Sequence, residues 1–202
     1  MYLSKIHINS SACRNPYEIH RVLWRLFPED VEARRDFLFR IEHSDRNHAD
    51  VLMQSKKKPE GSSVEARILA WKDFFLSLCA GQRLRFLLIA NPIKTIKNEA
   101  GQTEENGETK KCRVPLIREE SQRAWIERKF QYAASLESLV IDPMSPMRFR
   151  KGKEDRAGKI QPVRFQGILN VKTLEKMTDL VENGIGPAKA FGCGMLSLAK
   201  VC

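Results

Sequence analysis

The sequence contains few of the residues from which disulfide frameworks and metal sites are built. Its five cysteines are an odd number, lie far apart and include no C-x-x-C pair, which argues against a disulfide ladder or a zinc site. Only four histidines occur, and no two have the H-x-x-x-H or H-E-x-x-H spacing that places both on one helical face. We therefore expect no built-in catalytic metal and no other cofactor.

Long apolar runs are missing as well. No stretch of about 18 apolar residues could span a bilayer. The first residues, Met-Tyr-Leu-Ser-Lys-Ile-His, lack the charged start and the apolar run of a signal peptide. Because the scattered cysteines also suit a reducing compartment, we expect a cytoplasmic protein with no membrane partner.

The chain carries a surplus of positive charge. Its 35 Lys and Arg residues, against 25 Asp and Glu, give a formal net charge of +10. Such a field attracts polyanions, so nucleic acid is the leading class of partner. Charge alone shifts the odds only modestly, because many basic proteins bind nothing specific.

The first half of the chain alternates strands with helices. Alternating apolar and polar residues predict four strands, at 2–8, 37–42, 51–54 and 82–90. An i, i+3, i+4, i+7 apolar stripe predicts a helix at 16–27, with Asn15 as its N-cap and Pro28 as its stop. Residues 64–78 suit a helical face and could equally contain a strand; interpreted as a helix, they complete a βαββαβ order.

The second half repeats this order of elements. Strands are predicted at 113–117, 139–149, 160–171 and 195–200, and helices at 119–134 and 173–183. Pro143 and Pro146 make the second of these strands an edge strand or a broken one. Residues 150–159 are predicted to be a basic loop.

The expected fold class is therefore α+β, with two tandem ferredoxin-like (RRM-like) βαββαβ domains. A chain of 202 residues, 42% of them hydrophobic, can bury one medium core or two small ones. Residues 96–111 are polar, contain glycines and show no apolar period, so they predict a linker. The predicted domains are 1–95 and 112–202.

A glycine-rich segment lies between the last helix and the last strand. Gly184, Gly186, Gly192 and Gly194 surround Lys189. Glycine allows close approach of another chain and can turn backbone N–H groups outward, which suits phosphate; the plain alternative is a tight turn without a ligand. The pattern is neither a Walker A loop, which needs Gly-Lys-Ser/Thr, nor a Rossmann turn, which follows the first strand.

This segment, Gly-Ile-Gly-Pro-Ala-Lys-Ala-Phe-Gly-Cys-Gly-Met-Leu-Ser-Leu, resembles the C-terminal glycine-rich signature of the CRISPR-repeat endoribonucleases. Other segments resemble the CasE branch of that family and span nearly the whole chain in order: 1–5, 17–20, 23–28, 35–39, 90–95, 112–117 and 158–161. The resemblance implies tandem ferredoxin-like domains, in agreement with the fold expected from the pattern. It also implies a partner RNA, the repeat hairpin of precursor crRNA, and the other subunits of a CRISPR surveillance complex.

His20 lies at the flank of the 16–27 helix, roughly 100° from the middle of its apolar stripe. Tyr17 and Trp24 share that flank, and the Tyr-x-x-His spacing lets two side chains address one ligand. A lone helical histidine is by itself more often packed or solvated than catalytic. The resemblance implies that His20 is the catalytic histidine and Tyr17 the nearby tyrosine that positions or assists.

The resemblance further implies cleavage of the RNA by its own 2′-hydroxyl, leaving 2′,3′-cyclic phosphate and 5′-hydroxyl ends, with the product retained. A base must take the 2′-hydroxyl proton, an acid must protonate the leaving 5′-oxygen, and cations must stabilise the phosphate. An imidazole can serve either proton transfer near neutral pH. We expect His20 to act as a general acid/base, without choosing between the two steps.

Several cations are candidates for contact with RNA. Arg21 and Arg25 could steady the phosphate or could equally form a solvated face. The basic stretch 150–159 matches the region where the family grips its RNA, and it could otherwise be a solvated loop. The candidates outside the predicted helix are Lys94, Arg113, Lys153, Arg156, Lys159 and Lys189.

Two other functions remain possible from the residues alone. A non-catalytic RNA-binding scaffold needs only RRM-like units and a basic surface, although the Lys/Arg-Gly-Phe/Tyr-Gly-Phe run of base-stacking RRMs is absent from the sequence. A structural subunit would use the charge only to bind acidic protein neighbours.

Overall fold

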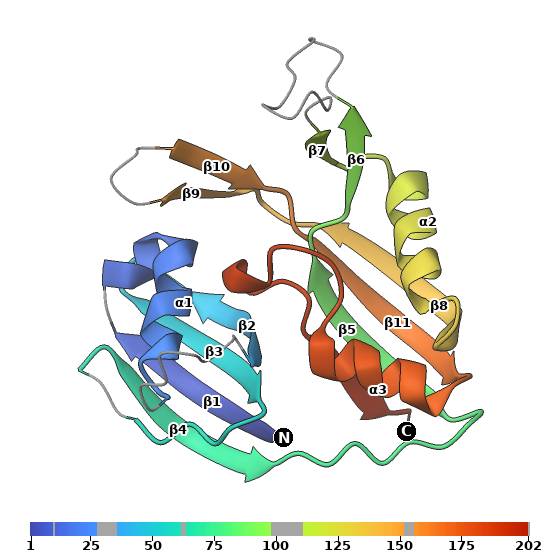
Figure 1. The fold of residues 1–202 in the computed structure, drawn as a ribbon, viewed down its shortest axis with the longest axis horizontal. Helices are drawn as coiled ribbons and strands as arrows, with labels where there is room; N and C mark the ends of the chain where they lie inside the picture. Colours follow the sequence, from blue (N-terminus) through green and yellow to red (C-terminus); the bar gives the residue numbers. More distant parts are fainter. Residues whose placement is uncertain (10, 28–35, 62–63, 98–110, 152–155, 202) are drawn as a thin grey trace, which may run out of the picture.

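The computed structural model describes residues 1–9, 11–27, 36–61, 64–97, 111–151 and 156–201. Figure 1 shows two four-stranded antiparallel sheets with helices packed against them, one sheet at each end of the molecule. Each sheet has its own cluster of buried apolar side chains. The expected α+β class and the tandem ferredoxin-like arrangement are confirmed.

The first domain has strand order β2-β3-β1-β4. Its elements are β1 (Tyr2–Asn9), a 3-10 turn (Ser11–Arg14), α1 (Pro16–Trp24), β2 (Phe37–Ser44), β3 (His48–Ser55) and β4 (Ala66–Asp73). Helix α1 begins as expected, because the Asn15 side chain accepts a hydrogen bond from the N–H of Tyr17 at 3.2 Å. Its predicted stripe, from Ile19 to Leu26, is buried against the sheet.

The predicted helix at 64–78 is wrong, because Ala66–Asp73 forms strand β4 at the edge of the first sheet. Two side chains that supported a helical face, Trp71 and Phe75, are 46% and 82% exposed. The next residues follow a period of two instead: Phe74, Leu76 and Leu78 pack against the core of the second domain. The helical spacing of the apolar residues in 64–78 therefore arose by chance, because β4 and the extended residues after it follow one another directly.

The second domain has strand order β12-β5-β11-β8 and a complete βαββαβ unit. Its elements are β5 (Arg83–Ala90), α2 (Glu119–Phe130), β8 (Ala134–Pro143), β11 (Val163–Val171), α3 (Leu174–Asn183) and β12 (Leu196–Lys200). The predicted domain boundary is wrong, because β5 pairs with β11 and β12 rather than with the first sheet. The crossing between domains lies at 74–82, not at 96–111.

Two antiparallel ribbons extend from the second domain (Figure 1). Strands β6 (Ile93–Lys97) and β7 (Lys111–Pro115) form one ribbon, so the predicted strand at 113–117 is not the first strand of a sheet. Strands β9 (Met147–Lys151) and β10 (Arg156–Ile160) form the other, so the predicted loop at 150–159 is largely a β-hairpin. Strand β8 is an edge strand that ends at Pro143, as its prolines predicted.

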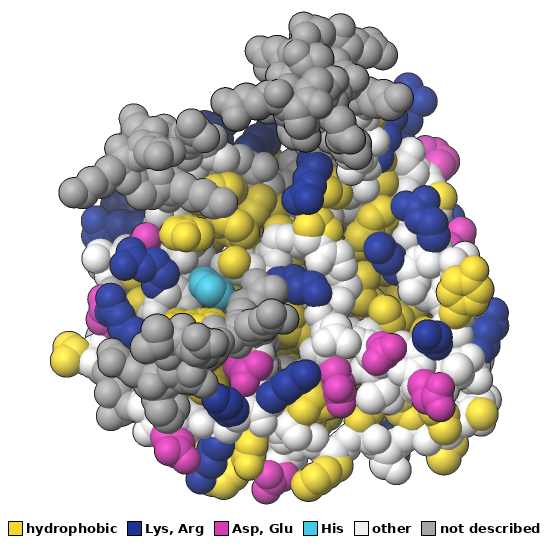
Figure 2. All heavy atoms as spheres, viewed as in Figure 1, with side chains coloured by type: hydrophobic (Ala, Val, Ile, Leu, Met, Phe, Trp, Pro, Cys, Tyr) yellow, Lys and Arg dark blue, Asp and Glu magenta, His cyan; other side chains and the backbone are white. Residues whose placement is uncertain are grey.

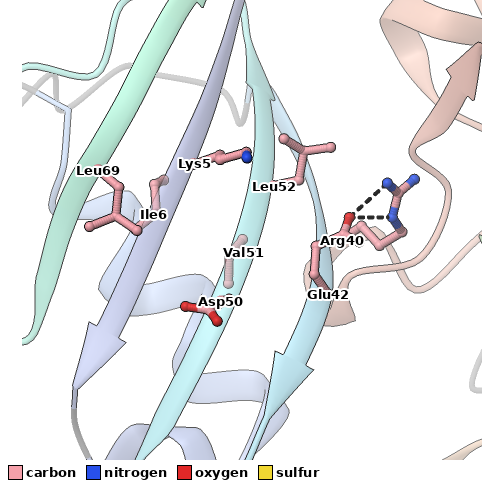
Figure 3. A pocket seen from close by; sticks show the side chains of 8 residues that line it. All are labelled: Lys5, Ile6, Arg40, Glu42, Asp50, Val51, Leu52 and Leu69. Atoms are coloured by element: carbon pink, nitrogen blue, oxygen red, sulfur yellow. Dashed lines mark hydrogen bonds and ion pairs between the residues drawn. The ribbon is translucent and has the colours of Figure 1, made fainter. Parts of the chain in front are cut away.

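Buried polar side chains join the two domains. Arg40 on β2 is 6% exposed, and its guanidinium donates to the Ser197 hydroxyl on β12 at 2.7 Å. The Gln54 amide on β3 donates to the carbonyl of Val181 on α3 at 2.8 Å. Figure 3 shows Arg40 paired with Glu42 at one side of a hollow of about 480 Å³ on the outer face of the first sheet.

None of the helices within the described residues is long and apolar enough to cross a membrane.

Candidate active site

The His20 imidazole is half-buried and rests on aromatic side chains of the first domain. Its ring stacks on Phe37 with 5.3 Å between centroids and 26° between planes. Trp24 and Phe39 lie 6.0 and 6.3 Å away by the same measure. Because Phe37 and Phe39 belong to the buried core, they give the imidazole a rigid backing.

Tyr17 lies one helical turn before His20, and its ring packs against the second domain. The centroid of Phe191, which ends the 3-10 turn Lys189–Phe191, is 6.0 Å from that of Tyr17. Helix α1 therefore contacts the glycine-rich segment that precedes β12. The active-site candidates on α1 are placed by both domains.

The β9–β10 hairpin carries cations beside α1, which β9 contacts. Arg148 and Lys159 face each other across its two strands, and both side chains are exposed. The backbone of Arg156 pairs with that of Lys151, while the side chain of Arg156 lies outside the described part of the structure, as does the whole of Lys153. On the face drawn in Figure 2, Lys and Arg side chains are spread over the upper, middle and lower parts, whereas Asp and Glu gather mainly in the lower half.

The arginines on and after α1 are held by carboxylates. Arg21 pairs with Glu18 at 2.9 Å, and Arg25 pairs with Glu65. Both arginine side chains are more than half exposed. A phosphate could therefore reach either arginine only by competing with its carboxylate.

Lys94 and Arg113 lie apart from the hairpin. Lys94 is on β6 and Arg113 on β7, both exposed. In the view of Figure 1 this ribbon extends away from α1, beyond the β9–β10 hairpin. Lys94 pairs with Val114 and Arg113 pairs with Thr95, so their side chains lie on opposite faces of the ribbon, and the structure does not bring either residue to His20.

The glycine-rich segment is folded against the protein itself. Gly184, Gly186, Gly192 and Gly194 have φ values of 71°, 81°, 80° and 95°, which favour glycine. The N–H groups of the first, third and fourth donate to protein carbonyls at 2.7–3.3 Å. The expected outward orientation of these N–H groups is therefore wrong for those three glycines.

Two side chains of this segment are also occupied within the protein. The Lys189 ammonium donates to the carbonyl of Asn183 and lines a hollow of about 330 Å³ that also includes Lys56 and Phe37. Cys193 is fully buried, and this burial raises the pKa of its thiol to about 12. Cys193 is therefore a neutral packing residue rather than a nucleophile.

Comparison with known proteins places this chain in a family. The model of the CRISPR associated protein family matches residues 1–200. The chain is 42% identical to the CRISPR system Cascade subunit CasE of Escherichia coli over 204 residues that cover both chains fully. The chain belongs to the CasE family.

Solved structures of CasE relatives have the same fold. The crystal structure of Cas6e from Escherichia coli covers both chains fully with a TM-score of 0.85 and 40% identity. The CRISPR endoribonuclease Cse3 bound to 19 nt of RNA has a TM-score of 0.78 and 30% identity, over 98% of this chain and 100% of that one.

Several residues of this candidate site were not predicted from the sequence. Phe37 was assigned to a strand but not predicted to stack on His20, and Arg148 was assigned to a strand rather than to a basic hairpin. Phe149 and Phe191 were not singled out at all. The available signal was the alternation of Met147 and Phe149 with Arg148, which predicts a ribbon with one apolar and one basic face.

The described residues contain no group of three or more His, Cys, Asp or Glu side chains that could hold a metal ion.

Proposed function

We propose that this chain is a metal-independent endoribonuclease that binds the repeat hairpin of precursor crRNA and cleaves it once at a fixed position. The observation that supports the proposal best is the His20 imidazole, held on Phe37 one turn from Tyr17 and beside a basic β-hairpin. A relative of the same fold is an endoribonuclease bound to RNA. His20 is the catalytic residue of the proposal, and Tyr17 assists it.

The proposed reaction needs only the RNA and protein side chains. The 2′-hydroxyl loses its proton to a base, its oxygen forms a bond to the adjacent phosphorus, and the bond from phosphorus to the 5′-oxygen breaks. The leaving oxygen takes a proton from an acid. The products carry a 2′,3′-cyclic phosphate and a 5′-hydroxyl. His20 performs one of the two proton transfers, and Tyr17 orients the phosphate or the attacking hydroxyl.

Binding of the RNA hairpin rests on contacts between its phosphates and exposed cations of the protein. An A-form stem is recognised mostly by its shape and backbone, which suits the basic face of the β9–β10 hairpin. Arg148 joins the set proposed from the sequence. That set consists of Arg21, Arg25, Lys94, Arg113, Lys153, Arg156, Lys159 and Lys189. Because CasE of Escherichia coli is a Cascade subunit, we propose that this chain also keeps its crRNA and assembles with other subunits.

A cleavage assay in EDTA tests the proposal. Repeat RNA is incubated with excess protein, and wild type is compared with His20→Ala and with His43→Ala, a control at an exposed histidine of β2. We expect His20→Ala to lose cleavage and retain binding, and His43→Ala to match wild type. A repeat with a 2′-deoxy residue at the cleaved position should resist wild type. RNA binding without any cleavage by wild type would instead support a scaffold.

A further inference from the structure

Three aromatic rings connect the three parts of the molecule that meet at the candidate site. Tyr17 on α1 contacts Phe191 of the glycine-rich segment, with 6.0 Å between ring centroids. Phe191 contacts Phe149 on β9, with 4.3 Å between centroids. Phe191 is only 8% exposed, so it is the buried centre of this aromatic bridge. The catalytic helix and the basic hairpin are thus joined through one side chain of a third segment.

Gly158 makes room for this arrangement on the hairpin. It faces Phe149 in the β9–β10 register, and a Cβ built on it would lie 2.2 Å from the nearest ring atom. A side chain at 158 would therefore displace the Phe149 ring. The neighbouring pair, Arg148 and Lys159, is exposed on the opposite face of the hairpin. One face of the β9–β10 hairpin therefore packs against the rest of the protein, and the opposite face is exposed and can bind a polyanion.

The segment that carries Phe191 is also seated behind His20. A Cβ built on Gly192 would lie 3.3 Å from the ring of Phe39, which is one of the aromatic side chains around the imidazole. The turn therefore lies close to Phe39 through Gly192 and contacts the Tyr17 ring through Phe191. Its own position is fixed by the bond from the N–H of Gly194 to the carbonyl of Ile89.

We infer that Phe149 and Phe191 are positioning residues, which set the distance between RNA held by the β9–β10 hairpin and the side chains of Tyr17 and His20. RNA gripped through Arg148 and Lys159 can present its scissile bond to His20 only if the hairpin keeps its place on α1. Loss of the aromatic bridge leaves the cations in reach of RNA but removes that alignment. This inference rests on the proposed function.

The predicted signature is a loss of rate without a loss of affinity. Small misplacements of reacting groups can cost up to about 10²-fold in rate. Phosphate contacts, in contrast, depend on charge and tolerate small shifts of the hairpin. We expect Phe149→Ala to lower the cleavage rate at saturating protein at least about tenfold, while the Kd for RNA changes less than about threefold.

The experiment measures single-turnover cleavage in full-length protein, and Kd with a repeat RNA made uncleavable by 2′-deoxy substitution. Phe149→Ala and Phe149→Leu are compared with Phe149→Tyr, which should restore most of the rate. Phe75→Ala, at a phenylalanine that is 82% exposed, is the matched control and should behave as wild type. Gly158→Ala should reproduce the defect of Phe149→Ala, and the double variant should be no worse than Phe149→Ala alone.

The outcomes separate this inference from the proposed function. Wild-type rates in Phe149→Ala and Gly158→Ala, or a rate loss fully explained by weaker binding, would overturn the aromatic bridge and leave the nuclease proposal standing. Absence of cleavage by wild-type protein, with RNA still bound, would overturn the nuclease proposal and this inference with it. A slow but tight-binding Phe149→Ala together with an active Phe149→Tyr would support both.

Discussion

The guanidinium of Arg40 reaches from β2 to the hydroxyl of Ser197 on β12, at 2.7 Å, and so joins the central sheets of the two domains. The same guanidinium is held by Glu42 at 2.8 Å. A buried donor that loses its acceptor costs about 1–3 kcal/mol. The Arg40–Ser197 contact therefore contributes to the stability of the domain junction.

We predict that Ser197→Ala lowers the free energy of unfolding by about 1–3 kcal/mol, because the Arg40 guanidinium stays buried with one acceptor fewer. Urea denaturation measures the change, and Arg67→Ala, at an exposed arginine of β4, serves as the control. An unchanged urea midpoint in Ser197→Ala would show that water or another group replaces the hydroxyl without cost.

Alanine at Gly194 should be far more costly than alanine at Gly81. Both glycines have positive φ, 95° and 74°, so backbone strain of about 1–2 kcal/mol applies to each. Only at Gly194 would the new Cβ lie 2.9 Å from a backbone atom, the carbonyl oxygen of Ile185. We expect a loss of about 2–5 kcal/mol at Gly194 and about 1–2 kcal/mol at Gly81, measured as unfolding free energies. Equal losses would contradict the close packing of the glycine-rich segment.

The pair of Arg83 and Glu137 predicts an effect of pH on stability. Hydrogen bonding to Arg83, at 2.5 and 2.8 Å, lowers the pKa of the Glu137 carboxyl below its usual value, and the charge of Arg83 adds to this. A lowered pKa in the folded state means stabilisation above the usual carboxyl pKa that is lost as pH falls through the folded value. Glu137→Gln should therefore be less stable than wild type near neutral pH and equal to it in strong acid. Tm measured against pH, with Glu127→Gln on α2 as control, tests this.

Thiol labelling should distinguish the cysteines by exposure. Cys79 and Cys112 are exposed, whereas burial raises the pKa of Cys193 to about 12, which leaves almost no thiolate at pH 8. Iodoacetamide followed by mass spectrometry of peptides should find the first two modified and Cys193 unmodified in the native protein. Rapid native labelling of Cys193 would show that the glycine-rich segment opens readily.

The salt dependence of RNA binding should reveal which cations touch phosphate. Each lost phosphate contact lowers the slope of log K against log salt by about 1. We expect this loss in Arg148→Ala and Lys159→Ala, and a smaller one in Lys94→Ala on the distant ribbon. Lys176→Ala on α3 is the control. An unchanged slope in both hairpin variants would exclude the hairpin from the phosphate contacts.

The predictions from the sequence succeeded where the signal was local. Helix α1 could be placed because Asn15, Pro16 and an apolar stripe all mark the same element, and α3 because its stripe is equally clear. Strand β4 was missed because Trp71 and Phe75 share a helical spacing with Ile68 and Leu78, which are partly buried. Whether such a segment is a helix or a strand shows in which of its side chains are buried, and that burial depends on a partner strand that is distant in the sequence.

The domain boundary and the junction could not be predicted for a related reason. Strand β5 has the pattern of any half-buried strand, and nothing in it states which sheet it joins. Leu38 and Arg40 occupy the face of β2 that a solitary sheet would leave to solvent, yet both are buried at the junction. The glycines likewise signal unusual backbone conformations without stating what the backbone packs against.

The position of β5 has a consequence for biosynthesis. β5 is an inner strand of its sheet, between β11 and β12, and β12 ends at Lys200. A growing chain that has passed the ribosome as far as α3 still lacks one neighbour of β5, the turn that carries Phe191, and the Ser197 acceptor of Arg40. In the order of translation, the turn that carries Phe191 therefore follows every other described element except β12, and the Tyr17 ring can gain its contact with Phe191 only after those elements have been made.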